Sequence, residues 1–226
     1  MHPIRAILFD LDGVIVDSNP AIEHFWKSIT DQEGIELTDL AIRTWIHGRK
    51  VGDTLSGLFG HLSEERHQEI REAAHQFDLS ITPKAVAGVT DFIRQLQKQS
   101  LPVGLVTSSH HSRMLKMITQ LDIHDQFTHF VTAQDVSKGK PDPEPYLAMS
   151  SKMELDPGHC LVFEDAISGI QSAQKAGMHS IGIGKDWAQK DLCLHGAKDV
   201  ISDFSEIIIH QRTFTTPNGT VFTSVG

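Results

Sequence analysis

The stretch Ala6-Ile7-Leu8-Phe9-Asp10-Leu11-Asp12-Gly13 decides the fold, because an apolar run ends there in two aspartates spaced two residues apart. Residues 5–9 have the pattern of a buried β-strand. If the chain stays extended through Asp12, the two-residue period of a strand directs both carboxylates to the same side. One metal ion or one phosphate group can then contact both acids.

A calcium-binding loop is the first alternative for two aspartates followed by glycine. The EF-hand pattern has Asp or Asn at its fifth position, Gly at its sixth and Glu at its twelfth. Counted from Asp10, these positions hold Val14, Ile15 and Ala21, so the EF-hand is excluded. Taken alone, the segment also fits a simple acidic turn after a strand.

A second apolar run, residues 103–106, ends in the hydroxyl residues Thr107, Ser108 and Ser109. Hydroxyl groups at this point can hold phosphate oxygens. Ser109 also fits the N-cap of a helix predicted over residues 110–121. Both interpretations are compatible, because a helix N-terminus after a strand is itself an anion-binding site.

Two further segments add charged groups. Lys140 lies among prolines just before a predicted helix, but Pro141 occupies the place where a Walker motif needs Ser or Thr. A third apolar run, residues 161–163, ends in Glu164 and Asp165, and a helix to about residue 177 is predicted after it. Singly, these residues also fit a solvated loop lysine and helix first-turn acids. Together they fit a site beyond the carboxyl ends of a parallel sheet.

These segments, in order over roughly residues 4–185, resemble the four motifs of the haloacid dehalogenase-like superfamily of Mg-dependent phosphatases and phosphomutases. Asp10 and Asp12 match the first motif, Thr107 with Ser108 the second, Lys140 the third, and Glu164 with Asp165 the fourth. The resemblance implies an α/β fold with a Rossmann-like three-layer core and a central, mostly parallel sheet.

The resemblance also implies the roles of the first-motif acids. Asp10 is expected to be the nucleophile that forms an aspartyl-phosphate. Asp12 is expected to be the general acid and base, which protonates the leaving alcohol and then takes a proton from water. Branches that cleave carbon–halogen or carbon–phosphorus bonds lack an acid at this position. Its presence here favours phosphoryl transfer.

The cofactor expected from the resemblance is Mg²⁺. Its ligands would be the Asp10 carboxylate, the Asp12 backbone carbonyl and Asp165, with Glu164 as a direct or indirect ligand. Lys140 and Thr107 would stabilise the transferring phosphoryl group. Like charges about 4 Å apart repel by roughly 4 kcal/mol at an effective dielectric of about 20. Clustered carboxylates beside a phosphate therefore need a cation, and Mg²⁺ suits an oxygen-rich site.

The chain between the first two motifs is far longer than an ordinary connection and has helical patterns at residues 20–33, 38–46, 53–59 and 63–77. We therefore predict an inserted all-helical cap domain. The predicted division is a discontinuous catalytic core over 1–15 and 86–210, a cap over 16–85, and a C-terminal tail or hairpin over 211–226.

Substrate-binding residues are expected on the cap face above the acids. The candidates are His47, Arg49 and Lys50, together with His24 in the first cap helix and Ser108 in the core. The alternative is that Gly48 ends a helix and the cations beside it are solvated.

This cap segment resembles the one in sugar- and polyol-phosphate phosphatases. In the hexose phosphomutase branch a histidine of the first cap helix assists the acid–base residue, and the matching position here is Ile22. This difference favours hydrolysis, although His24 nearby keeps the mutase open. The resulting hypothesis is a Mg-dependent phosphatase of a small phosphorylated sugar or polyol. The alternatives are a β-phosphoglucomutase-type hexose phosphomutase and a phospho-ligand sensor without turnover.

Composition narrows the partners and the location. With 29 acidic against 20 basic residues, a net charge of −9 and no basic tract, nucleic-acid binding is disfavoured. No apolar segment has the length of a membrane span, and the first residues lack a signal-peptide apolar region. Cys160 and Cys193 form no disulfide framework. We expect a cytoplasmic enzyme acting on a small phosphorylated metabolite, with its oligomeric state left open.

Overall fold

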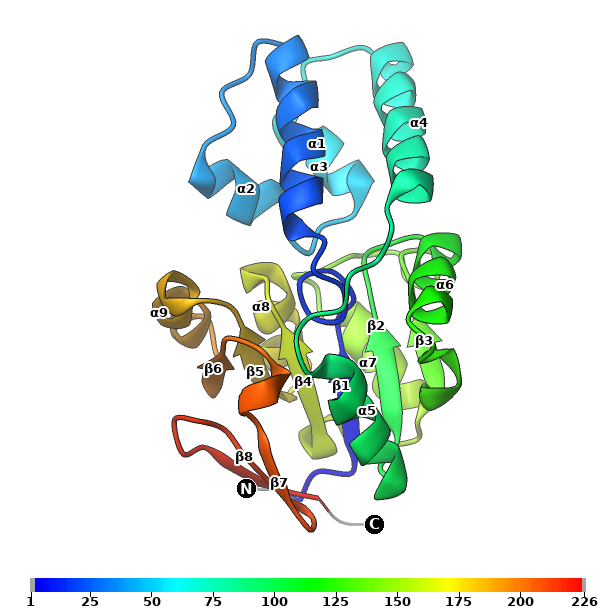
Figure 1. The fold of residues 1–226 in the computed structure, drawn as a ribbon. Helices are drawn as coiled ribbons and strands as arrows, with labels where there is room; N and C mark the ends of the chain where they lie inside the picture. Colours follow the sequence, from blue (N-terminus) through cyan, green and yellow to red (C-terminus); the bar gives the residue numbers. More distant parts are fainter. Residues whose placement is uncertain (1–2, 225–226) are drawn as a thin grey trace.

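A six-stranded parallel sheet forms the centre of the computed structural model, which describes residues 3–224 (Figure 1). Its strand order is β3-β2-β1-β4-β5-β6. The strands are β1 (Ala6–Phe9), β2 (Val103–Val106), β3 (His129–Val131), β4 (Cys160–Glu164), β5 (His179–Ile183) and β6 (Asp199–Ile201). The α/β, Rossmann-like fold class predicted from the sequence is confirmed. The predicted ends of the core and tail, residues 1–2 and 225–226, lie outside the described residues.

The register of the central strands brings the predicted motifs to one edge. Phe9 of β1 pairs with Leu105 of β2 on one side and with Phe163 of β4 on the other. The residues that follow these three positions therefore leave the sheet side by side.

Helices cover both faces of this sheet. On one face α5 (Val89–Lys98) and α6 (His111–Gln120) pack into a phenylalanine-rich core that includes Phe9 and Phe163. On the other face α7 (Glu144–Lys152) and α8 (Ile167–Lys175) pack against Leu8 and Val162. Burial on both faces explains why these strands read as continuous apolar runs. A further helix, α9 (Asp186–Leu194), lies near β6 (Figure 1).

Two core elements were absent from the sequence prediction. Helix α5 buries Val89, Phe92, Ile93 and Leu96, whose spacing is helical, so its pattern was available in the sequence. Strand β3 has three residues, two of them only partly buried, and is too short for a periodicity to show.

Four helices follow β1 and lie beyond the carboxyl edge of the sheet (Figure 1). They are α1 (Asn19–Gln32), α2 (Asp39–Trp45), α3 (Val51–Leu58) and α4 (Glu64–Ser80), and we call them the cap. The cap has its own apolar cluster, with Trp26, Leu55 and Phe59 at its centre. The proposed boundaries of the core, cap and tail domains stay predictions.

The two linkers between cap and core run together. The backbone N–H of Asp17 donates to the carbonyl of Lys84, and the N–H of Val86 donates to the carbonyl of Ile15. These bonds tie the segment entering the cap to the segment leaving it.

The chain ends in a small antiparallel sheet of β7 (Ile208–His210), β8 (Thr213–Thr215) and β9 (Val221–Thr223). Phe214 and Phe222 of this sheet extend the apolar core beneath α5. None of the helices within residues 3–224 combines the length and apolar character needed to cross a membrane.

Candidate active site

Lys140 joins the carboxyl ends of three strands. Its Nζ donates to Oδ1 of Asp10 at 2.7 Å, to the carbonyl oxygen of Val106 at 3.1 Å, and to Oε1 of Glu164. The lysine is 1% exposed. Because both of its acidic partners are also buried, they outweigh the effect of burial and raise the pKa of Lys140 above its usual range. The group is therefore a fixed cation.

Asp10 lies at the end of β1, almost fully buried. Burial raises the pKa of this carboxyl above its usual range, although the contact with Lys140 acts in the opposite direction. A carboxylate held this way, with few waters around it, is suited to act as a nucleophile.

Glu164 is fully buried and accepts a second hydrogen bond from Oη of Tyr146, at 2.7 Å. A Cβ on Gly169 would come within 2.0 Å of the Glu164 carboxyl group, so the close approach of α8 requires glycine. Tyr146 was not among the residues predicted for the site.

Asp165 completes an acidic cluster. Oxygens of Asp10, Glu164 and Asp165 all lie within 4.8 Å of one another. Burial, and then the charges of the two neighbouring acids, raise the pKa of Asp165 well above its usual range. Asn19, at the start of the cap, donates to Oδ2 of Asp165 at 2.5 Å. Two buried acids and a half-buried third, with one lysine among them, are short of positive charge, and this all-oxygen donor set fits Mg²⁺.

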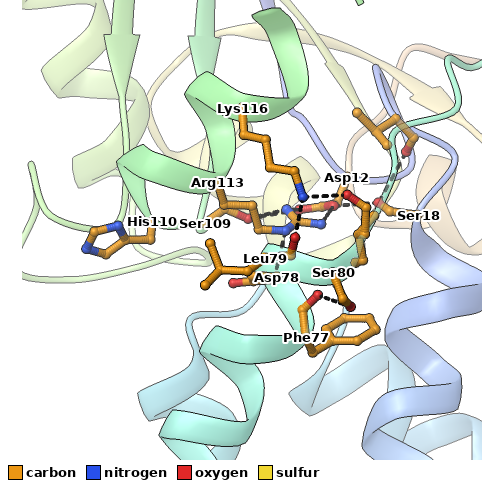
Figure 2. Close-up of polar contacts among 12 residues, drawn as sticks. Asp12, Ser18, Phe77, Asp78, Leu79, Ser80, Ser109, His110, Arg113 and Lys116 are labelled. Carbon is orange, nitrogen blue, oxygen red and sulfur yellow. Dashed lines mark hydrogen bonds and ion pairs between the residues drawn. The ribbon is translucent and has the colours of Figure 1, made fainter. Parts of the chain in front are cut away.

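Asp12 is held by four hydrogen bonds (Figure 2). Arg113 contacts both carboxylate oxygens, with Nη1 at 2.7 Å from Oδ2 and Nη2 at 2.6 Å from Oδ1. Ser18 and Ser109 donate from their hydroxyls at 2.5 and 2.9 Å. Burial works to raise the pKa of Asp12, but Arg113 outweighs it and holds this pKa below the usual range. Arg113 was not among the residues predicted for the site from the sequence.

The first two hydroxyl residues after β2 have different partners. Oγ1 of Thr107 accepts a hydrogen bond from the backbone N–H of Ser109 at 3.0 Å. Ser108 donates to the backbone carbonyl of Gly48, in the cap, at 2.8 Å. Both hydroxyl residues line the cavity described next.

A cavity of about 300 Å³ lies between cap and core, above the aspartates. From the core it is lined by Asp10, Asp12, Thr107, Ser108 and Arg113, and from the cap by Ile22, His47, Arg49, Lys50 and Asp78. It is large enough for a small phosphorylated metabolite.

The predicted cap residues divide into two groups. His47, Arg49 and Lys50 line the cavity, whereas His24 is exposed on α1 and is not among the described residues that line it. The helical phase explains this difference, because Ile22, Phe25 and Trp26 occupy the cavity side of α1.

The cap cations also contact the core. Nη1 of Arg49 donates to the carbonyl of Lys140 at 2.9 Å, and Nζ of Lys50 donates to the carbonyls of Ala133 and Val136, each at 2.8 Å. Nε2 of His47 lies 2.9 Å from Oε1 of Glu23. Burial lowers the pKa of His47, although Glu23 opposes the change.

This fold and site define a class of protein. The sequence matches the haloacid dehalogenase-like hydrolase family over residues 7–183, and the chain belongs to that family. The resemblance inferred from the four motifs is confirmed.

Three relatives named for an enzymatic activity match most of the chain. It is 32% identical to validoxylamine A 7'-phosphate phosphatase of Streptomyces hygroscopicus subsp. limoneus, over 79% of this chain and 85% of the relative. It is 30% identical to β-phosphoglucomutase of Bacillus subtilis (strain 168), over 80% and 84%. It is also 30% identical to hexitol phosphatase A of Escherichia coli (strain K12), over 87% and 93%.

Proposed function

We propose that this protein is a Mg-dependent phosphatase that hydrolyses a small phosphorylated sugar or polyol through an aspartyl-phosphate. The observation that carries the proposal is the meeting of Asp10, Asp12 and Lys140 with the acidic cluster at one edge of the sheet, below a cavity. Two of the relatives are named as phosphatases of small phosphorylated compounds, which supports the substrate class.

Asp10 attacks the phosphorus atom, and the bond between phosphorus and the leaving alcohol breaks. Asp12 takes up a proton from solvent when the anionic substrate binds beside it and gives this proton to the leaving alcohol. In the second step the resulting carboxylate takes a proton from the water that attacks the aspartyl-phosphate. Lys140 fixes the Asp10 carboxylate and, with Thr107, offers positive charge and a donor to the phosphoryl oxygens. The cap limits the access of other water to the cavity.

Asp10, Asp165 and Glu164 would hold the Mg²⁺, together with the backbone carbonyl of Asp12. When bound, the ion would neutralise part of the charge on the carboxylates and the phosphoryl oxygens. Glu164 already accepts hydrogen bonds from Lys140 and Tyr146, which favours an indirect role for it.

Arg49, Lys50 and His47, with Ser108 below them, would contact the substrate from the cavity walls. We do not retain His24 in this role, because its side chain is exposed away from the cavity. A cytoplasmic location is part of the proposal and is supported by the two free cysteines.

The test is phosphate release from a panel of sugar, hexitol and glycerol phosphates with Mg²⁺. We expect turnover of at least one of them by the wild type and near-total loss in Asp10→Asn, which keeps the size of the side chain but removes the nucleophilic charge. Activity retained by Asp10→Asn would show that the nucleophile is misassigned.

A hexose phosphomutase is the second candidate, because one relative is named β-phosphoglucomutase. The cavity carries Ile22 where that branch places a histidine, which favours hydrolysis. Incubation with a hexose 1-phosphate and its bisphosphate separates the two functions. Formation of the isomer without free phosphate would identify a mutase.

A further inference from the structure

Arg113 links the acid–base residue of the core to an acid of the cap. It lies in the first turn of α6 and is 4% exposed. Its two Nη atoms contact the two oxygens of Asp12, while its Nε lies 2.8 Å from Oδ1 of Asp78, in α4 (Figure 2). One buried cation therefore contacts both domains at once.

The contact with Asp12 determines the direction of that carboxylate. A planar guanidinium that bonds both oxygens fixes the position and the plane of its partner, whereas a serine hydroxyl rotates freely about its bond. Arg113 also donates to Oγ of Ser109 at 2.8 Å, so it helps to orient a second donor to Asp12. Within residues 3–224, Arg113 is the only charged side chain that donates hydrogen bonds to the Asp12 carboxylate, because the other two donors are serine hydroxyls.

The contact with Asp78 is part of a larger attachment of α4 to α6. Lys116, three residues after Arg113, donates to the carbonyl of Leu79 at 2.6 Å (Figure 2). It also donates to the carbonyl of Ile81 at 2.7 Å. These carbonyls lie at the end of α4, where the linker back to the core begins. The end of α4 is therefore fixed beside Asp12, and a movement of the cap would separate Asp78 from Arg113.

We propose that Arg113 is a positioning residue, whose guanidinium orients the Asp12 carboxylate. Its ion pair with Asp78 makes this orientation depend on the cap being packed against the core. The inference rests on the proposed function, in which Asp12 acts on the aspartyl-phosphate. Hydrolysis of that intermediate needs a carboxylate directed at the attacking water. Phosphoryl transfer to Asp10 from a substrate with a good leaving group does not need Asp12 as an acid.

The two steps separate in pre-steady-state kinetics with p-nitrophenyl phosphate and Mg²⁺. The burst of p-nitrophenol reports phosphoryl transfer to Asp10, and the later steady rate reports hydrolysis. For Arg113→Gln we expect the steady rate to fall about a hundredfold, at the low end of what a positioned acid–base group contributes, while the burst rate changes little. The p-nitrophenol trace of Arg113→Gln should therefore show a burst that is absent from, or smaller in, the trace of the wild type.

Two conservative variants refine the test. Arg113→Lys keeps the charge but loses the paired contact, so its steady rate should fall about tenfold, less than in Arg113→Gln. Asp78→Asn should show the same separation of the two phases with a smaller loss. If Arg113→Gln does not fold, as judged by thermal unfolding, these two variants carry the test.

Lys27→Met is the matched control, because it removes an exposed lysine of the cap whose ammonium pairs with Asp31, and it leaves Arg113, Asp78 and Asp12 in place. Both phases should then resemble those of the wild type. Equal losses of both phases in the Arg113 and Asp78 variants, or a wild-type steady rate in Arg113→Gln, would overturn the inference while leaving the proposed function intact. A wild type that never cleaves the substrate would instead contradict the proposed function and this inference with it.

Discussion

The hydroxyl of Tyr146 is expected to contribute measurably to stability, and Tyr146→Phe isolates it. The change removes the 2.7 Å hydrogen bond to Glu164 while keeping the ring, whose centroid lies 5.3 Å from Nζ of Lys140. Both partners are fully buried, so no solvent replaces the donor. A hydrogen bond to a charged group contributes about 1.5–3 kcal/mol, and we expect a loss of about 2 kcal/mol in the free energy of unfolding.

Urea unfolding measures this loss as a lower midpoint with an unchanged slope. In thermal unfolding, a loss of about 2 kcal/mol corresponds to a fall in Tm of about 4–8 °C for a chain of this size. Ser28→Ala is the control, because its exposed hydroxyl also makes a 2.7 Å hydrogen bond, to the carbonyl of Phe25. The control should stay within about 0.5 kcal/mol of the wild type. A similarly small change in Tyr146→Phe would refute the reasoning.

Three further predictions test the acidic cluster at Asp165, the contact of the cap with the core at Gly48, and the cap residue Asp78. Mg²⁺ at about 100 times its Kd should add about 2.7 kcal/mol to the free energy of unfolding, measured against EDTA, and Asp165→Asn should lose most of this gain; an equal gain in both proteins would contradict the metal assignment. Gly48→Ala should lower kcat/KM about a hundredfold, because a Cβ there would come within 2.5 Å of Oγ of Ser168 and prevent the cap from packing against the core, whereas Gly34→Ala, at a glycine with a similar positive φ but open space around it, should retain activity. Burial raises the pKa of Asp78 from 3.8 to about 6, so the native state binds this proton more tightly and the wild type loses stability as the pH rises through this range. The free energy of unfolding of Asp78→Asn, measured with urea, should therefore rise relative to that of the wild type by up to about 3 kcal/mol between about pH 4 and about pH 7. A difference in this free energy that does not change with pH would argue against this role of burial.

The convergence of the motif residues was accessible from the sequence. Asp10, Thr107 and Glu164 each follow an apolar run, and parallel strands deliver such residues to one edge of a sheet. Lys140 reaches the same edge from a loop, and its contact with Asp10 is observed. The chemical roles assigned to these residues stay predictions.

The contacts between core and cap were not accessible in the same way. Arg113 is separated from Asp12 by 101 residues, and no periodicity relates the two. Its pairing with Asp78 depends on how the cap sits on the core, which is a property of tertiary packing. Tyr146 reads as an ordinary core residue until the position of Glu164 is known. The exposure of His24, by contrast, follows from the apolar stripe of α1 and could be predicted from the sequence.

The attachment of the cap to the core has a consequence for how substrate binding is measured. Arg49 both lines the cavity and donates to the carbonyl of Lys140, so it links the cap to the lysine that holds Asp10. An effect of Arg49→Ala on KM therefore combines lost substrate contact with a loosened cap. Lys50 offers the comparison, because its ammonium contacts the carbonyls of Ala133 and Val136, away from Lys140. If substrate binding by Arg49 dominates, inhibition by inorganic phosphate should weaken more in Arg49→Ala than in Lys50→Ala, whose ammonium is already held by two core carbonyls. Inorganic phosphate is a small anion, so its binding reports the charge above the site and not the closure of the cap around a whole substrate.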